Sequence, residues 1–392
     1  MLPYVYLVAA GVIILTGLGF YRLQALIPFP TLLIGNLSIL LAGIVGIRIL
    51  LDLSGQDAVY FSALVWLRLL WVLGNLGLWT LAGRLFTLRQ GKRLFSLILA
   101  GGVLAIILTG LINSTLIEWL GIANLLWVSS ASLGGALWLL VITTRRFKSE
   151  LATAPTRPTN EAQANRHTTT GIFKNPYIRS IFLYTTLSTI GTYILEYAFI
   201  GQVDARFTGE QVGKFFGSYL GVNTLVTLLF LLFLSNRILR RFGVRGGLLV
   251  DPLLVGVGAI AVAIISQFPS LAAGIFWIVV ATKLLDDVTV VATTNTSVRL
   301  MYQPLPIAQR ARAQTFVESV VSPLAMGLSG VLILLFRAIL QLTSLQAIYL
   351  LMVVFVGWLI VGLLLGRQYY GALQKALRQR FLTGNEEKRF CR

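Results

Sequence analysis

Long uninterrupted apolar runs constrain this chain more than any other feature. About 20 helical residues cross a hydrocarbon core roughly 30 Å thick, and the sequence holds eleven runs of about that length. They lie at 2–20, 31–51, 59–82, 94–113, 121–143, 178–201, 215–235, 246–267, 270–292, 317–338 and 345–366. The runs do not alternate as barrel strands do, and a helix pairs its own backbone groups, as lipid requires. The sequence therefore predicts an all-α polytopic membrane protein with about 11 transmembrane helices.

Composition and charge exclude several other classes. Only 12% of residues are charged, and the mean hydropathy is +0.83, as in membrane proteins. The net charge of +18 does not indicate nucleic acid, because the basic residues lie between apolar runs and not on one polar face. The one cysteine, Cys391, excludes an internal disulfide or a cysteine metal site. We expect membrane lipid and a small anionic substrate as partners, and no nucleic acid, metal or cofactor.

Hydrolase and metalloprotease motifs are missing from the sequence, so we expect no enzyme. There is no G-x-S-x-G and no H-E-x-x-H. The lone histidine, His167, falls in the polar segment "ATAPTRPTNEAQANRHTTTG", where a solvated histidine is the simplest expectation.

Segments rich in basic residues follow every second apolar run. Most of the 32 Lys and Arg residues fall in segments that share one side if Met1 is outside, and only Arg206 and Lys214 fall in outside loops. Lysine and arginine near helix ends favour the cytoplasmic side. We therefore predict a multi-pass protein of the bacterial inner membrane, with its N-terminus outside and its C-terminus cytoplasmic. The first run lacks a preceding basic region, so we interpret it as a membrane helix and not as a signal peptide.

The basic and apolar pattern also predicts four parts. These are an N-terminal bundle of five helices (1–144), a cytoplasmic linker (145–177), a C-terminal bundle of six helices (178–366) and a basic cytoplasmic tail (367–392). The basic loops of the two bundles coincide only if the first bundle lacks its opening helix. On that alignment "GKRLFSLILAGGVLAIILTG" matches "RARAQTFVESVVSPLAMGLSG", as expected for the internal repeats of carriers.

Three stretches resemble the ATP/ADP translocases, the nucleotide carriers of plastids and intracellular bacteria, and their bacterial relatives. They are "LGLWTLAGRLFTLRQGKRLFSLILAGG", "TYILEYAFIGQV" and "YQPLPIAQRARAQT". The resemblance extends weakly from about Pro3 to Tyr370 and implies a major-facilitator-like two-bundle fold that exchanges nucleotides by alternating access. The family's opening helix, which carries a functional lysine, has no counterpart here, in agreement with the repeat pattern.

Charged residues inside the apolar runs are the candidate substrate-binding residues. Arg68 and Lys283 lie near the middle of equivalent runs, where a charge costs about 2.5–3.5 kcal/mol and usually faces a cavity or a partner. They would place a cation on each wall of a central cavity and bind an anion. Lys283 has an alternative, because Asp286 and Asp287 follow it at the i+3 and i+4 positions of one helical face.

The intramembrane carboxylates are candidates for coupling or counter-ion roles, and Glu196 is also a candidate substrate-binding residue. Glu196 could bind a proton or cation, or neutralise a basic residue such as Arg68. Asp286 and Asp287 could form a proton relay, although their spacing from Lys283 favours a charge-balanced cluster.

Four basic residues are expected at the cytoplasmic mouth: Lys92, Arg93, Arg310 and Arg312. They could attract phosphates, but a topological role explains them better. Gly213, Gly217 and Gly221 recur every four residues, which predicts close packing against another helix.

The sequence thus predicts a membrane transporter that moves a nucleotide or other organic anion, with ATP and ADP as candidates. The alternative is a non-transporting protein, truncated or acting as a sensor or scaffold, that retains the carrier fold.

Overall fold

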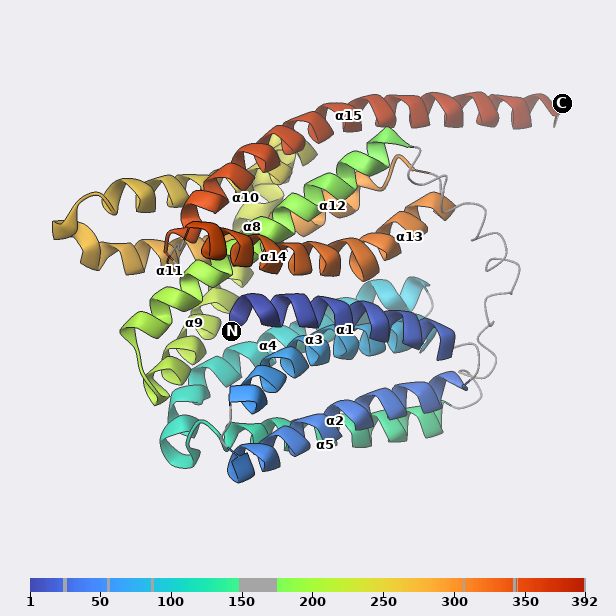
Figure 1. The fold of residues 1–392 in the computed structure, drawn as a ribbon. Coiled ribbons are helices and arrows are strands. Elements are labelled where there is room, and N and C mark those ends of the chain that lie inside the picture. The colour runs from blue at the N-terminus through green and yellow to red at the C-terminus, as the bar shows by residue number, and fades with distance from the viewer. Residues whose placement is uncertain are drawn as a thin grey trace. The chain divides into compact units, whose positions relative to one another are not determined.

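The computed structural model describes residues 1–23, 27–54, 57–85, 88–147, 175–305, 307–340, 343 and 345–390. Every element in these ranges is helical (Figure 1). The α-helices are α1 (Leu2–Leu23), α2 (Phe29–Ser54), α3 (Asp57–Leu85), α4 (Leu88–Leu120), α5 (Leu125–Arg146), α8 (Pro176–Arg206), α9 (Glu210–Phe230), α10 (Asn236–Ile265), α11 (Ala272–Thr289), α12 (Asn295–Met301), α13 (Ile307–Phe316), α14 (Ser322–Leu340) and α15 (Ala347–Phe390). Short π-helical segments are η1 (Leu231–Ser235), η3 (Val290–Thr294) and η4 (Val317–Val321), and η2 (Pro269–Leu271) is a 3₁₀ turn.

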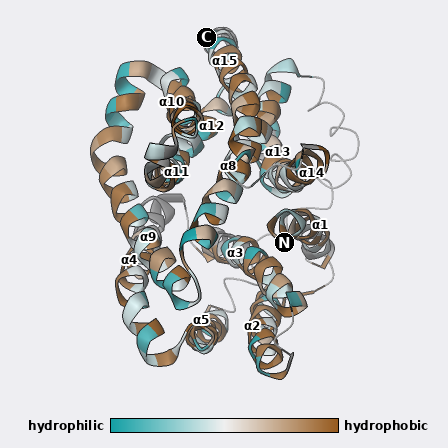
Figure 2. Cartoon of the chain, turned by 60° about the vertical axis from the view of Figure 1, so that its left-hand side comes forward, coloured by the Kyte–Doolittle hydropathy of each residue, from teal (hydrophilic) through white to brown (hydrophobic). Residues whose placement is uncertain are grey.

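The helical class expected from the apolar runs is confirmed, because most residues of each run are helical. Seven stretches of the described residues are long and apolar enough to cross a membrane, and hydrophobic residues dominate most of the helices in Figure 2. The protein is thus an all-α membrane protein. A count of eleven crossings and a major-facilitator-like arrangement stay predictions.

One of the seven stretches, Glu210–Ile265, is 56 residues long, enough for two crossings. It contains a break at Gly243, whose φ is 66° and ψ is −170°. Glycine reaches this left-handed region without the Cβ clash that other residues meet. The break falls within the basic segment "NRILRRFGVRGG", where the sequence predicts a cytoplasmic loop between two helices.

The chain forms two compact units. Unit 1 comprises Met1–Glu161 and Phe207–Thr224, and unit 2 comprises Ala162–Arg206 and Leu225–Arg392. The N-terminal part of α9 therefore groups with unit 1, whereas the two sequence halves assign it to the second bundle. Residues 148–174 of the predicted linker, with His167, lie outside the described residues, and the four predicted parts stay a prediction.

A close crossing of α4 and α9 explains this grouping. Asn113 on α4 donates a hydrogen bond to the carbonyl oxygen of Gly213 at 3.0 Å. A Cβ on Gly217 would overlap the Asn113 side chain, and a Cβ on Gly110 would lie 2.7 Å from the Cα of Gly221. The expected glycine face of α9 is thus confirmed as a packing surface, and Lys214 adds an ion pair to α4.

We expect Gly110→Ala to destabilise unit 1 by about 1–3 kcal/mol, because its Cβ meets backbone that does not move independently of the helix. Gly102→Ala is the matched control on the same helix, since nothing lies within 4 Å of a Cβ there. It should be neutral or stabilising through higher helix propensity. Thermal unfolding of both variants in detergent tests this, and equal effects would contradict the crossing.

Candidate functional site

A buried ion-pair network lies on α11 in unit 2. The Nζ of Lys283 is 2.9 Å from Oδ2 of Asp286 and 2.6 Å from Oδ1 of Asp287. The side chain of Asp286 is fully buried, that of Lys283 is 7% exposed, and that of Asp287 is 29% exposed. The i+3 and i+4 pairing open to Lys283 in the sequence is therefore present. Asp287 forms the accessible side of the network.

Helix α8 contributes to the same network. The hydroxyl of Thr192 donates to Oδ1 of Asp286 at 3.1 Å. Glu196 is partly buried and lies one turn further along α8, so the two residues share a helical face. The structure therefore brings α8, with its candidate carboxylate, to the helix that carries Lys283.

Asp251 on α10 was not among the candidates from the sequence. Its side chain is fully buried, and its two oxygens lie 2.8 Å from Oγ1 of Thr289 and 3.2 Å from Oγ1 of Thr294. Its position in "GLLVDPLLVG", an acidic residue inside an apolar run, was a usable signal, because such residues are costly in lipid and usually functional.

Helices α10 and α11 approach closely beside Lys283. A Cβ on Gly258 would overlap the side chain of Thr282, the residue before Lys283. Glycine thus permits the contact that brings Asp251 toward α11. A larger residue at Gly258 would separate the two helices.

A proline follows Asp251 and changes the backbone hydrogen bonding of α10. Pro252 has no N–H to donate to the carbonyl of Leu248 one turn earlier. The hydroxyl of Tyr184 on α8 donates to that oxygen at 2.7 Å instead, and Tyr184 is fully buried. This side chain satisfies a carbonyl that lipid would leave unpaired and fixes α8 against α10.

The Asp251 site also adjoins the π-helical segment η3. Thr294 belongs to η3, and Ser235, at the end of η1, donates to the η3 carbonyl of Ala292 at 2.7 Å. π-Helical turns are rare and are frequently found at functional positions. The backbone is thus irregular at the residues that surround the buried carboxylate.

The other candidate residues lie elsewhere. Arg68 belongs to unit 1, where its guanidinium lies over the ring of Tyr6 at 5.8 Å, so the central cavity between Arg68 and Lys283 stays a prediction. Arg310 is exposed on α13. The side chains of Lys92, Arg93 and Arg312 lie outside the described residues.

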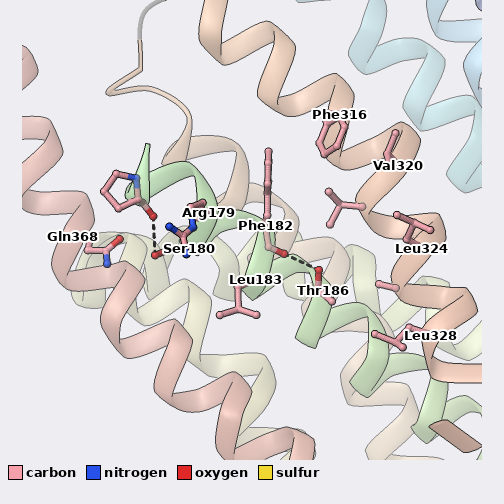
Figure 3. A pocket seen from close by; sticks show the side chains of 13 residues that line it. Arg179, Ser180, Phe182, Leu183, Thr186, Phe316, Val320, Leu324, Leu328 and Gln368 are labelled. Atoms are coloured by element: carbon pink, nitrogen blue, oxygen red, sulfur yellow. Dashed lines mark hydrogen bonds between the residues drawn. The ribbon is translucent and has the colours of Figure 1, made fainter. Parts of the chain in front are cut away.

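Unit 2 also has an open groove, separate from the network, with a volume of about 780 Å³. Figure 3 shows Arg179 and Gln368 on one side and Val320, Leu324 and Leu328 of η4 and α14 on the other. The described lining residues are mostly apolar and include no carboxylate. The groove could accommodate an apolar chain with a polar end.

No protein-family model matches the chain, and no curated protein matches its sequence. The resemblance to the ATP/ADP translocases therefore rests on the three sequence stretches alone.

Together, the described network and the Asp251 site contain Lys283 and three carboxyl groups from α10 and α11, with hydroxyls from α8, α11 and η3. Such a set can bind and release a proton, and its lysine can exchange one carboxylate for another anion. These are the steps that an ion-coupled carrier requires.

Proposed function

We propose that the protein is a membrane carrier, related to the ATP/ADP translocases, that moves a nucleotide or other organic anion by alternating access. The observation that carries this proposal is the network of Lys283, Asp286, Asp287 and Asp251 on α10 and α11, in which all but Asp287 are buried. Charges in a membrane interior are rare and mark substrate or ion pathways. The carrier would lie in a bacterial inner membrane with its N-terminus outside and its C-terminus cytoplasmic.

Lys283 is the proposed anion-binding residue in unit 2. Its partner Asp287 is the more exposed of the two carboxylates, so an incoming phosphate or carboxylate could replace Asp287 at the Nζ atom while Asp286 stays paired. The lysine would then keep a negative partner throughout the cycle, which avoids an uncompensated buried charge. Arg68, in unit 1, is the proposed second cation, and Glu196 is its proposed counter-ion or a coupling carboxylate.

We expect purified protein in liposomes to take up labelled ATP, ADP or another phosphorylated anion, and faster when unlabelled anion is inside. Protein-free liposomes and heat-unfolded protein are the controls. Folded protein that takes up none of these anions, with or without internal anion, would contradict the carrier proposal.

A non-transporting membrane protein that retains the fold is the second candidate. The observation in its favour is that Lys283 already has two carboxylate partners, as a purely structural network would. The same uptake assay separates the two, because a scaffold or sensor would give no uptake under any internal condition.

A further inference from the structure

The burial of Asp251 bears on whether its carboxyl group is ionised. Its side chain is fully buried, and its hydrogen-bond partners are two hydroxyl groups, those of Thr289 and Thr294. Lys283 already bonds to Asp286 and Asp287. An ionised Asp251 would therefore add a third negative charge beside Lys283 among the described contacts, and a buried charge without an ionic partner is costly.

The contacts of the Thr289 hydroxyl indicate that the Asp251 carboxyl group is protonated. The Oγ1 of Thr289 lies 2.8 Å from Oδ1 of Asp251 and 2.7 Å from the carbonyl oxygen of Leu285. A threonine hydroxyl has a single hydrogen and cannot donate to both oxygens. If Asp251 is protonated, its O–H donates to Oγ1, the Thr289 hydrogen goes to Leu285, and both short contacts are hydrogen bonds.

The same geometry favours a proton over a metal ion. The 2.8 Å separation of Oδ1 and Oγ1 is that of a direct O–H···O hydrogen bond, so no cation is needed to join the two oxygens. The part of the chain that the structure describes contains no group of three or more His, Cys, Asp or Glu placed for a metal.

We propose that Asp251, with Thr289 and Thr294, is a proton-binding site that is occupied in the conformation described. The charged and titratable groups around it are Asp286 and Lys283 on α11 and Tyr184 on α8. Release of the proton would create a carboxylate beside Asp286, so it requires Lys283 or an incoming cation to approach. The proton site stands independently of the carrier proposal, while its use in transport rests on that proposal.

Infrared spectroscopy of the protein in lipid vesicles tests the site, because a protonated carboxyl has a C=O stretch apart from the carboxylate and amide bands. At neutral pH we expect this band in the wild-type protein, a shift in D₂O, and its loss in Asp251→Asn. Asparagine has the shape of the neutral acid, so the variant should fold. Asp287→Asn is the matched control and should retain the band.

Thr289→Val provides a second measurement if Asp251→Asn does not fold. It removes the hydroxyl that accepts the carboxyl proton, and the band should move to higher frequency. A wild-type spectrum without the band, or a band unchanged in both Asp251→Asn and Thr289→Val, would overturn the proposal. If the protein shows the band but takes up no anion, the proton-site proposal stands and the carrier proposal is contradicted.

Discussion

Lys283→Ala is expected to lower the free energy of unfolding by about 3–5 kcal/mol, because removing one partner leaves a buried charge uncompensated. The carboxylate left behind is Asp286, whose side chain is fully buried. Its remaining described partner is the Thr192 hydroxyl, which does not neutralise it. The loss of Lys283 would cost less free energy at Asp287, because its side chain is 29% exposed. Thermal unfolding in detergent, followed by circular dichroism, measures the loss.

The double variant Lys283→Ala/Asp286→Asn separates pairing from substrate binding. It removes the stranded charge and should recover most of the lost stability, as contacting residues do in double-mutant cycles. Arg310→Ala, at an exposed position, should change stability little and serves as the control. If Lys283→Ala stays as stable as the wild type and loses only anion binding, the ion pairs are secondary and Lys283 faces the substrate.

The helices themselves could be predicted from the sequence. A segment that crosses the bilayer needs about 20 helical residues and must pair its backbone N–H and C=O groups internally, as a helix does. The glycine face of α9 was predictable for a similar reason. Gly213, Gly217 and Gly221 repeat every four residues, which places them on one helical face. The sequence did not show which helix would pack there, since Asn113 on α4 is about a hundred residues away.

In the candidate site, too, the contacts within one helix could be predicted from the sequence and the contacts between helices could not. The pairing of Lys283 with Asp286 and Asp287 follows from their spacing along one helix. The contribution of Thr192 from α8, and that of Asp251 from α10, depends on tertiary packing that no periodicity encodes. Asp251 itself is an acidic residue in an apolar run, and its cost in lipid indicates a functional position.

The irregular backbone was harder to foresee. The π-helical segment η3 is "VVATT", four β-branched residues and an alanine across the end of the apolar run 270–292. β-Branched residues lower helix propensity only slightly, so this composition does not predict a π-helix. The carbonyl of Leu248, by contrast, is left without its helical donor by Pro252. That defect was predictable from the sequence, although its partner Tyr184 was not.

Asp251→Asn is expected to abolish accumulation driven by a pH gradient while leaving anion exchange intact. A carboxyl that binds and releases a proton can couple the gradient to anion movement, whereas asparagine presents the neutral shape and never ionises. For one proton per anion, one pH unit stores about 1.4 kcal/mol, equal to roughly tenfold accumulation. In liposomes that are acidic outside, the wild-type protein should approach a roughly tenfold ratio of internal to external anion. The variant should reach only equal internal and external concentrations.

Counter-exchange in the same liposomes provides the internal control, because it requires binding and alternating access but no net proton movement. Asp251→Asn should exchange labelled for unlabelled anion at a rate close to that of the wild type. Glu196→Gln is the decisive comparison, since Glu196 lies one turn from Thr192 on the helix that bonds to Asp286. If Glu196→Gln removes the accumulation and Asp251→Asn does not, the coupling carboxylate is Glu196, and the proton on Asp251 serves only to keep a buried acid neutral.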